Sequence, residues 1–366
     1  MTGSPAGRRR RPLPDFPWDL LAPAKKRAAE HPGGIVDLSI GTPVDPVPAA
    51  VQAALVGAAD SPGYPLTAGS PALRAAITDW VVRHTGVTGG FAVLPTIGSK
   101  ELVAGLPTLL GLGPGDVVVI PSVCYPTYEV GVRLAGAEVV RSDRPQVEVD
   151  PAGVRLVWVN SPGNPTGRVL PAADLAAIVE WGRAVGAVVA SDECYLSLGW
   201  DPAAPPVSAL SLGGVEGVLA VHSLSKRSNL AGYRAGFVAG DPELVADLLE
   251  VRKHGGLIVP APVQAAMAAA LADEEHVGAQ RARYAARREA LSGALTAAGF
   301  TIDDSEAGLY LWVTDGNPCW ETVDRLATLG ILAAPGEFYG PAGAKHVRVA
   351  LTGTDERVAE AVRRLR

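Results

Sequence analysis

The fold is decided by the stretch Arg155-Leu-Val-Trp-Val159, the turn Asn160-Ser-Pro-Gly-Asn-Pro-Thr-Gly167, a helical segment and a second stretch, Ala187-Val-Val-Ala-Ser191. Each stretch is short and rich in β-branched residues, which favours a strand. Strands that alternate with helices are typical of an α/β fold with a mainly parallel sheet, and continuous apolar runs indicate burial on both faces. In such a sheet, ligands bind beyond the carboxyl ends of the strands.

The same alternation extends over most of the chain. Further strands are predicted at 117–120, 138–141 and 218–222, and helices at 18–30, from Ser70 to His84, and after Gly98. Beyond Gly255 the pattern changes to a long Ala-rich helical region at 260–298, followed by strands at 309–313 and 347–351. We therefore expect an N-terminal arm that joins a small domain (1–44), a large domain (45–254) and a C-terminal small domain (255–366).

Composition excludes several classes of function. The 366 residues are 48% hydrophobic and 19% charged, with a net charge of −6, which disfavours nucleic acid as the principal partner. No apolar segment reaches the roughly 18 to 20 residues that span a bilayer, so we expect a cytoplasmic protein without a membrane partner. The basic run Arg8–Arg11 is interpreted as a solvated tail. Three scattered cysteines predict neither a disulfide framework nor a metal site.

Lys226 is the most distinctive chemical feature. It stands in His222-Ser-Leu-Ser-Lys-Arg-Ser-Asn-Leu-Ala-Gly-Tyr-Arg234, in a chain that has six lysines and 26 arginines. A desolvated lysine amine can lose its proton and form a Schiff base, whereas an arginine cannot. The alternative is an exposed loop lysine.

Other polar residues follow predicted strands. Asp192 and Tyr195 come after the stretch at 187–191, where a carboxylate needs a partner or a solvated cleft; turn duty is the alternative for Asp192, and a structural ion pair is the interpretation of Glu193. Asn164 lies in the rigid turn at 160–167. The segment Gly98-Ser99-Lys100 opens a helix whose N–H groups suit a phosphate. Tyr125 presents a ring for stacking, whereas packing is favoured for Tyr128.

Together these segments resemble the fold-type I, class I/II aminotransferases that depend on pyridoxal 5′-phosphate (PLP), from about Asp37 to Leu351. The resemblance implies a large domain with a mainly parallel seven-stranded sheet flanked by helices and a smaller α+β domain. One departure is Gly163, where many relatives have a second asparagine. The motifs that carry the resemblance are Gly41 before Thr-Pro, Tyr64 ahead of Gly69 and Leu73-Arg74, Gly98-Ser99-Lys100, Tyr125-Pro126, Asn164-Pro-Thr-Gly, Asp192-Glu-Cys-Tyr195, Ser223-Leu-Ser-Lys226, Arg234 and Val347-Arg348-Val-Ala.

The resemblance also implies catalytic roles. Lys226 would form the Schiff base with PLP and then move the proton between the substrate α-carbon and the cofactor. Asp192 would pair with the protonated pyridine nitrogen and keep the ring an electron sink. Asn164 and Tyr195 would hydrogen-bond the phenolic oxygen of PLP, and Tyr125 would stack on its ring.

The resemblance also implies which residues would bind the phosphate of PLP and the substrate. The phosphate would be held by Ser99, the Lys100 amide, Ser223, Ser225 and Arg234, and by Tyr64 of a neighbouring subunit, which implies a homodimer. The substrate α-carboxylate would be bound by Arg348, with Gly41 and Asn164 beside it. A surface ion pair is the alternative for Arg348.

Within the family, the segments at 13–21, 37–46 and 97–101 are most similar to actinobacterial N-succinyldiaminopimelate aminotransferases. That similarity implies a ping-pong exchange between glutamate or 2-oxoglutarate and N-succinyl-2-amino-6-oxopimelate. The alternatives are an aspartate, aromatic or histidinol-phosphate aminotransferase, a β-lyase, and a non-catalytic PLP-binding regulator, although no DNA-binding segment accompanies the fold. An acidic acceptor needs a second cation, for which the candidates are Arg27, Lys25, Lys253 and Arg252.

Overall fold

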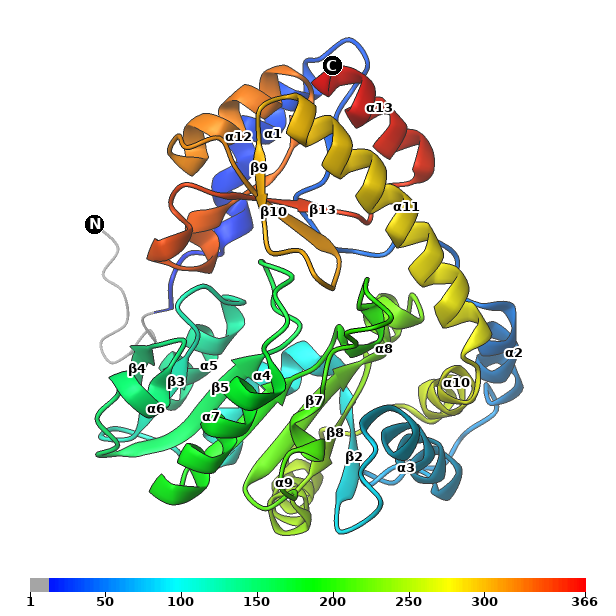
Figure 1. Cartoon of the computed structure of the whole chain (residues 1–366). Helices are drawn as coiled ribbons and strands as arrows, with labels where there is room; N and C mark the ends of the chain where they lie inside the picture. Colours follow the sequence, from blue (N-terminus) through cyan, green and yellow to red (C-terminus); the bar gives the residue numbers. More distant parts are fainter. Residues whose placement is uncertain (1–12) are drawn as a thin grey trace, which may run out of the picture.

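A seven-stranded sheet forms the centre of the larger part of the molecule, in the lower half of Figure 1. The computed structural model describes residues 13–366, so the basic run Arg8–Arg11 lies outside the described residues. Six strands run in one direction and β8 runs against them, as expected for a mainly parallel sheet. The strand order is β2 (Ala92–Ile97), β8 (Ala235–Gly240), β7 (Val218–Ser223), β6 (Val188–Asp192), β5 (Val154–Asn160), β3 (Val117–Ile120) and β4 (Glu138–Arg141).

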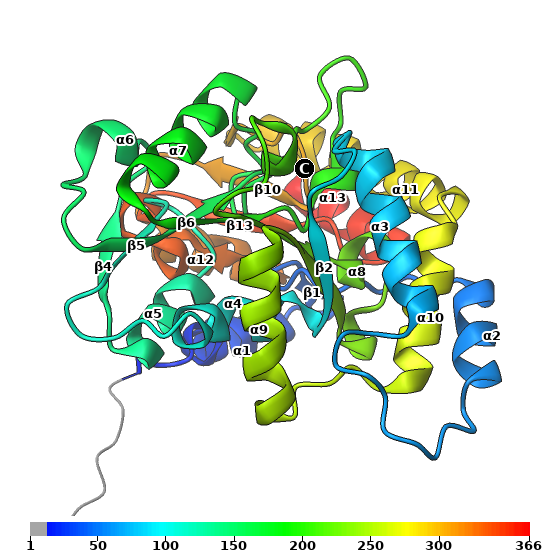
Figure 2. The ribbon, with the colours of Figure 1, turned by 90° about the horizontal axis from the view of Figure 1, so that it is seen from below.

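Helices cover both faces of this sheet, because its strands are apolar on both sides. Val218 and Ala220 of β7 face one layer, and Leu219 and Val221 face the other. Figure 2 shows α7 on one side of the sheet and α4 and α5 on the other. The first layer contains α2 (Ala49–Gly57), α3 (Pro71–Thr85), α7 (Ala172–Val185) and α10 (Ala261–Ala272); the second contains α4 (Gly98–Leu109), α5 (Thr127–Ala135) and α9 (Pro242–Gly255).

The direction of β8 decides which residues meet at one edge of the sheet. The carboxyl ends of β5, β6 and β7 lie together, because these strands are parallel and paired in register. Since β8 is antiparallel to β7, its first residue lies at that same edge, with Ser223 of β7 opposite Gly236. The helical turn α8 (Leu224–Arg227) follows β7 directly. Residues before β8 and after β7 therefore meet.

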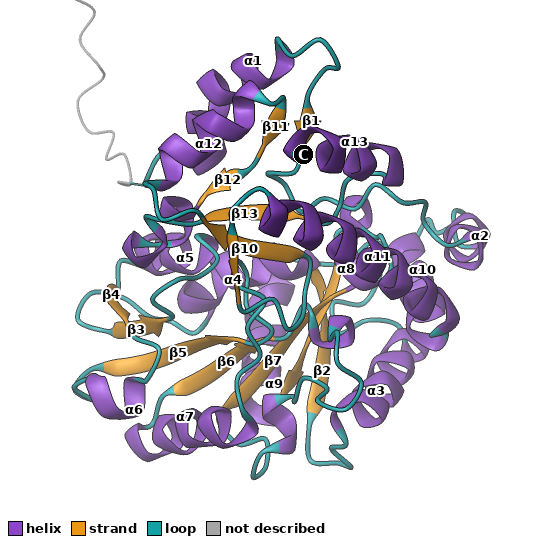
Figure 3. Ribbon diagram, turned by 45° about the horizontal axis from the view of Figure 1, so that its top comes forward, coloured by secondary structure: helices purple, strands orange, loops and turns teal. Residues whose placement is uncertain are grey.

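The smaller part is built on a four-stranded antiparallel sheet, shown as the upper group of orange strands in Figure 3. Helices α1, α11, α12 and α13 pack around it and share one hydrophobic core with it. A short parallel pair, β1 with β11, joins the N-terminal segment to this part. The elements are β12 (Ala334–Pro335), β13 (Val347–Ala350), β10 (Tyr310–Thr314), β9 (Thr301–Asp303), β1 (Val36–Asp37), β11 (Ile331–Leu332), α1 (Ala22–Ala29), α11 (Glu275–Ala297), α12 (Cys319–Thr328) and α13 (Asp355–Leu365); the short helix α6 (Pro145–Glu148) belongs to the larger part.

Most predicted elements are present within one or two residues. The helix from Ser70 begins as predicted, since the Ser70 hydroxyl accepts a hydrogen bond from the Leu73 amide. The helical region at 260–298 is two helices that break at Asp273 and Glu274. Helix α10 packs against α2 and α3, whereas α11 packs against α13. The domain boundaries at 44/45 and 254/255 stay predictions.

Three structural absences concern residues 13–366 alone. No helix there is both long and apolar enough to cross a lipid bilayer. Nor does any group of three or more His, Cys, Asp or Glu side chains lie where it could hold a metal ion. All three cysteines are free thiols, of which Cys124 and Cys319 are buried.

Candidate active site

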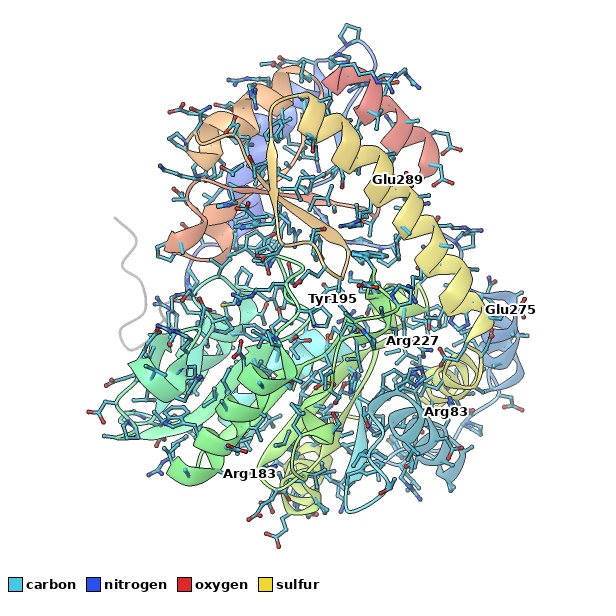
Figure 4. All side chains as sticks on the ribbon, viewed as in Figure 1. Arg83, Arg183, Tyr195, Arg227, Glu275 and Glu289 are labelled. Atoms are coloured by element: carbon cyan, nitrogen blue, oxygen red, sulfur yellow. The ribbon has the colours of Figure 1, made fainter. Side chains whose placement is uncertain are left out.

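A cavity of about 370 Å³ lies at the edge where the strands of the large sheet end, beneath the smaller part. Tyr195, labelled at the centre of Figure 4, stands between the two parts. Every residue predicted to bind the cofactor or the substrate α-carboxylate, except Tyr64, lines this cavity: Gly41, Ser99, Lys100, Tyr125, Asn164, Asp192, Tyr195, Ser223, Ser225, Lys226, Arg234 and Arg348.

Lys226 reaches the cavity from the turn that follows β7. The Ser223 hydroxyl starts this turn by accepting a hydrogen bond from the Ser225 amide at 3.1 Å. The Lys226 ammonium donates to the carbonyl of Gly41. Burial lowers the pKa of Lys226, and the nearby cations Arg348 and Arg234 lower it further, against the opposing effect of Tyr310. A larger fraction of the amine is therefore neutral and nucleophilic than in an exposed lysine.

Asp192 is a buried carboxylate at the end of β6, only 6% exposed. One oxygen accepts a hydrogen bond from the Tyr128 hydroxyl at 2.8 Å, and the other accepts from the Cys194 amide at 3.1 Å. Burial raises the pKa of Asp192, and these hydrogen bonds oppose the rise. No cationic side chain among the described residues pairs with Asp192. The carboxylate therefore accepts a turn hydrogen bond from Cys194 and has no cationic side-chain partner among the described residues.

Asn160 fixes the loop that carries Asn164. Its amide nitrogen donates to the carbonyls of Pro162 and Asp192, at 3.1 and 3.0 Å. Its amide oxygen accepts from the Asn164 backbone at 2.8 Å. This one side chain ties the loop after β5 to the end of β6, so Asn164 and Asp192 keep a fixed relation.

The start of α4 forms a cradle with Arg234. Gly98 has a positive φ of 70°, and a Cβ there would lie 2.5 Å from the Arg234 guanidinium. A Cβ on Gly236 would lie 3.0 Å from the Ser99 amide nitrogen. Two glycines thus let β8 and Arg234 approach the first N–H groups of α4, where the helix dipole favours an anion.

Arg348 is buried, with 2% exposure, and has no carboxylate partner in residues 13–366, which excludes a surface ion pair. One terminal nitrogen donates to the Asn164 side chain at 3.0 Å and the other to the Ser39 carbonyl at 2.6 Å. Its Nε has no partner among the described residues. The guanidinium carbon lies 4.0 Å from the centre of the Tyr310 ring and 4.9 Å from that of Tyr339. Aromatic faces and carbonyl oxygens thus hold the cation.

Sequence reasoning missed three aromatic residues of this cavity, Phe16, Trp18 and Tyr310. Phe16 and Trp18 belong to the segment around η1 (Pro17–Leu21), far from the strand ends that supplied the other candidates. No local pattern marked Tyr310, because Trp312, which shares its strand face, does not line the cavity. Tyr128 packs against Trp158 as expected, but its hydroxyl also binds Asp192.

Tyr64 and the proposed second cations lie elsewhere. Tyr64 is fully exposed and contributes nothing to the cavity of its own chain. Arg252 is buried against Glu101, Lys253 pairs with Glu250, Arg27 with Asp324, and Lys25 lies 3.9 Å from Asp37. None of these four candidates lines the cavity of its own chain, so none of them supplies the second cation there. Lys100 does line it, with its ammonium 5.6 Å from the centre of the Phe16 ring.

Glu193 is not the ion-pair residue that the sequence suggested. It is buried beside His222, with 3.6 Å between Oε2 and Nε2, and its other oxygen accepts from the Ala209 amide. Burial raises the pKa of Glu193 to about 7 and lowers the pKa of His222 to about 3. Between about pH 3 and pH 7 the carboxyl group is therefore mostly protonated and the imidazole mostly neutral.

Comparisons with known proteins agree with this geometry. Residues 34–365 match the family model "Aminotransferase class I and II". The chain belongs to this family. It is 60% identical to a probable aminotransferase of Mycobacterium tuberculosis, over 96% of this chain and 85% of that protein. It is 56% identical to 4-dedimethylamino-4-oxo-anhydrotetracycline transaminase of Streptomyces rimosus, over 97% and 99%.

Solved structures extend the comparison to the fold. N-succinyldiaminopimelate aminotransferase from Mycobacterium tuberculosis superposes with a TM-score of 0.85 at 30% identity, covering 96% of this chain and 99% of that chain. The present chain therefore has the fold-type I architecture, and the family to which it belongs depends on PLP.

The residues present fit PLP. Asp192 is a buried anion without a cationic side-chain partner in residues 13–366, and a protonated pyridine nitrogen would supply the missing charge. The cradle of Gly98 and Arg234 suits a phosphate dianion. The Lys226 amine faces the same cavity, where it can bond to an aldehyde carbon.

Substituting Asp192→Asn should separate cofactor retention from folding. The cofactor-free variant should melt no lower than the parent, because a buried charge is removed, while its Kd for PLP should rise about tenfold or more with loss of the charge pair. Thermal melting without PLP and equilibrium dialysis with it measure the two effects. An unchanged Kd would place the pyridine nitrogen away from Asp192.

Substituting Glu193→Gln should remove one of two opposing effects of pH on the free energy of unfolding. From its ordinary pKa of 4.5 up to about 7, folded Glu193 keeps a proton that the unfolded chain has lost, so stability falls with rising pH. His222 has the opposite effect between about 3 and 6.5, because only the unfolded imidazole takes up the proton. The free energy of unfolding of the variant minus that of the parent should therefore rise from pH 4.5 to 7 in urea titrations. A difference that stays flat across this range would contradict the neutral pair.

Proposed function

We propose that the protein exchanges an amino group between glutamate or 2-oxoglutarate and N-succinyl-2-amino-6-oxopimelate by a ping-pong mechanism. The observation that carries this proposal is the set of cations at the cavity, where Arg348 and Lys100 both lack an acidic side-chain partner in residues 13–366. Two acidic substrates that take turns in one site need such cations. The similarity to the N-succinyldiaminopimelate aminotransferase structure supports the same substrate.

The proposed roles follow from the side chains that line the cavity. Bound PLP supplies an aromatic ring that draws electrons away from the substrate α-carbon. Lys226 would hold the cofactor covalently, and its amine would move the proton to and from the substrate α-carbon. Asp192 keeps the pyridine nitrogen protonated, and Tyr195 and Asn164 hydrogen-bond the phenolic oxygen. Tyr125 stacks on the ring, and the phosphate is bound by Ser99, Lys100, Ser223, Ser225 and Arg234.

Arg348 orients the substrate through its α-carboxylate. Asn164 and Ser39 already hold both terminal nitrogens, so the guanidinium plane is fixed before the substrate arrives. The Nε–H is left for the carboxylate, which also accepts from a terminal N–H in the bidentate arrangement that arginine favours. Gly41 also lines the cavity and would present its backbone to the substrate.

Lys100 is proposed to bind the distal carboxylate of the acidic substrates. Its side chain lines the cavity, and its ammonium lies 5.9 Å from the centre of the Tyr125 ring. Burial lowers the pKa of Lys100, and Arg234 lowers it further, so an acidic group nearby would restore the charged form. This function of the ammonium is compatible with phosphate binding by the Lys100 backbone amide.

A bulky aromatic ketone is the second candidate for the amino acceptor. The 56% identity to the Streptomyces rimosus transaminase extends over 99% of that protein, which is named for an anhydrotetracycline substrate. The rings of Phe16, Trp18 and Tyr125 line the same cavity, and Phe16 is half exposed. A flat polycyclic substrate could pack against these rings.

The homodimer belongs to the proposal as well. Tyr64 is fully exposed beside Leu66, which is also exposed, on the segment between α2 and α3. We propose that this segment meets a second subunit and that Tyr64 reaches the phosphate of the neighbouring site. The cytoplasmic location expected from the sequence is likewise a prediction, which cell fractionation tests.

Half-reactions against a panel of amino donors should identify the substrate. Glutamate and N-succinyl-diaminopimelate should each convert the enzyme to its amino form, whereas aspartate, phenylalanine and histidinol phosphate should react far more slowly. Substituting Lys100→Met should lower kcat/KM for both acidic donors about tenfold or more, because a charge-assisted hydrogen bond is lost. Stopped-flow absorbance measures each rate. Fast reaction with only an aromatic amine would favour the second candidate, and no half-reaction at all would favour a binding protein.

Subunit mixing tests the position of Tyr64. The variants Tyr64→Ala and Lys226→Ala should each be inactive or nearly so as pure dimers. After the subunits are mixed and re-associated, hybrid dimers contain one intact site, so activity should recover to about a quarter of the parent value. Mixing each variant with itself is the control. Absence of recovery, with hybrids shown by mass spectrometry, would refute a contribution across the interface.

A further inference from the structure

Tyr310 lines the cavity together with Lys226 and Tyr195, and none of the roles proposed above includes it. It is the first residue of β10, which pairs with β13 so that Tyr310 lies opposite Ala350 and Trp312 opposite Arg348. Opposed residues of antiparallel strands share a face, and so do residues two apart. The side chains of Tyr310 and Arg348 therefore point into the same cavity.

The hydroxyl of Tyr310 touches two elements of the site at once. It lies 3.2 Å from the Tyr195 hydroxyl, with the two rings arranged edge to face. It also lies over Gly41, where an added Cβ would be 2.1 Å from the Tyr310 oxygen. The carbonyl of Gly41 is the acceptor for the Lys226 ammonium. Tyr195 and Gly41 therefore both lie against the phenol oxygen, and Lys226 is bound to the backbone of Gly41.

The groups around Lys226 have opposing effects on its pKa. Groups that act on Lys226 come from every neighbouring element: Tyr310 from β10, Arg348 from β13, Cys194 after β6 and Arg234 before β8. Of these, Arg348 and Arg234 oppose the charged form of Lys226, whereas Tyr310 and Cys194 favour it. Burial works against ionisation of Tyr310, but the cations of Arg348 and Lys226 lower its pKa. The phenol thus stabilises two cations that would otherwise only repel each other.

We propose that Tyr310 is a positioning residue of the active site, whose hydroxyl orders both the Tyr195 hydroxyl and the Lys226 amine. The inference rests on the proposed roles of Lys226 and Tyr195. The ring of Tyr310 has a separate task, since it supports the Arg348 guanidinium at 4.0 Å. Substituting Tyr310→Phe keeps that ring and removes the hydroxyl alone.

The first test uses the cofactor-free protein. Acetic anhydride acylates neutral amines, and peptide mass spectrometry reports the extent at each of the six lysines across a pH series. In Tyr310→Phe, the pKa of Lys226 should fall because a stabilising group is lost, so Lys226 should be labelled about threefold faster below its midpoint. The other five lysines of the same chain are internal controls.

Tyr284→Phe is the matched variant. Tyr284 is buried on α11, its hydroxyl has no hydrogen-bond partner among the described residues, and it does not line the cavity. Its labelling profile should equal that of the parent. If Tyr310→Phe fails to fold, Tyr195→Phe breaks the same hydroxyl contact from the other side. It should also raise Lys226 labelling, because the unsupported Tyr310 oxygen stabilises the ammonium less.

The second test uses the protein loaded with PLP. The pH titration of its visible absorbance should move to lower pH in Tyr310→Phe and not in Tyr284→Phe. Identical labelling and titration in Tyr310→Phe and the parent would overturn the inference. Borohydride reduction of the parent keeps the two levels separate. If reduction does not fix PLP on Lys226, the proposed function fails, whereas fixation with unchanged Tyr310→Phe behaviour rejects the positioning role alone.

Discussion

Two buried charges of opposite sign face one cavity and remain unpaired with each other. Arg348 is 2% exposed and Asp192 is 6% exposed, and neither has an oppositely charged side chain beside it in residues 13–366. Burying a charge without a partner costs several kcal/mol of folding free energy, so such an arrangement is maintained only by a surrounding structure that holds both groups in place. An amino acid and a protonated pyridine nitrogen carry the complementary charges, which is why these two residues define the chemistry of the site.

The topology of the large sheet keeps the two charges apart. Asp192 ends β6, where Tyr128 and Cys194 hold it, whereas Arg348 lies on β13 of the smaller sheet. Asn164 is the link, because it binds Arg348 while Asn160 ties its loop to the carbonyl of Asp192. Lys226 enters between them after β7. A rigid loop and three strand ends therefore set the distances that a transferred amino group has to match.

Features that depend on neighbouring residues could be predicted from the sequence, whereas contacts between distant residues could not. Strands at 187–191 and 218–222 are local patterns, and their ends marked Asp192 and Lys226 correctly as cavity residues. Strands β2 and β8 escaped notice, since β2 contains Pro95 and β8 is rich in glycine and alanine. The contact of Tyr310 with Tyr195 joins residues 115 positions apart, which no local pattern encodes. The second cationic residue of the cavity was not found for the same reason, because spacing does not show that Glu101 already binds Arg252.

Glu193 completes the electrostatic argument. It follows Asp192 in the chain and is equally buried, so two carboxylates at the end of β6 would repel each other if both were ionised. Burial of Glu193 beside His222 relieves this conflict, because it raises the pKa of Glu193 to about 7. With Glu193 protonated, Asp192 is left as the negative charge at that strand end. Below about pH 7, Glu193 therefore adds no second negative charge beside Asp192, the residue that a protonated pyridine nitrogen would pair with.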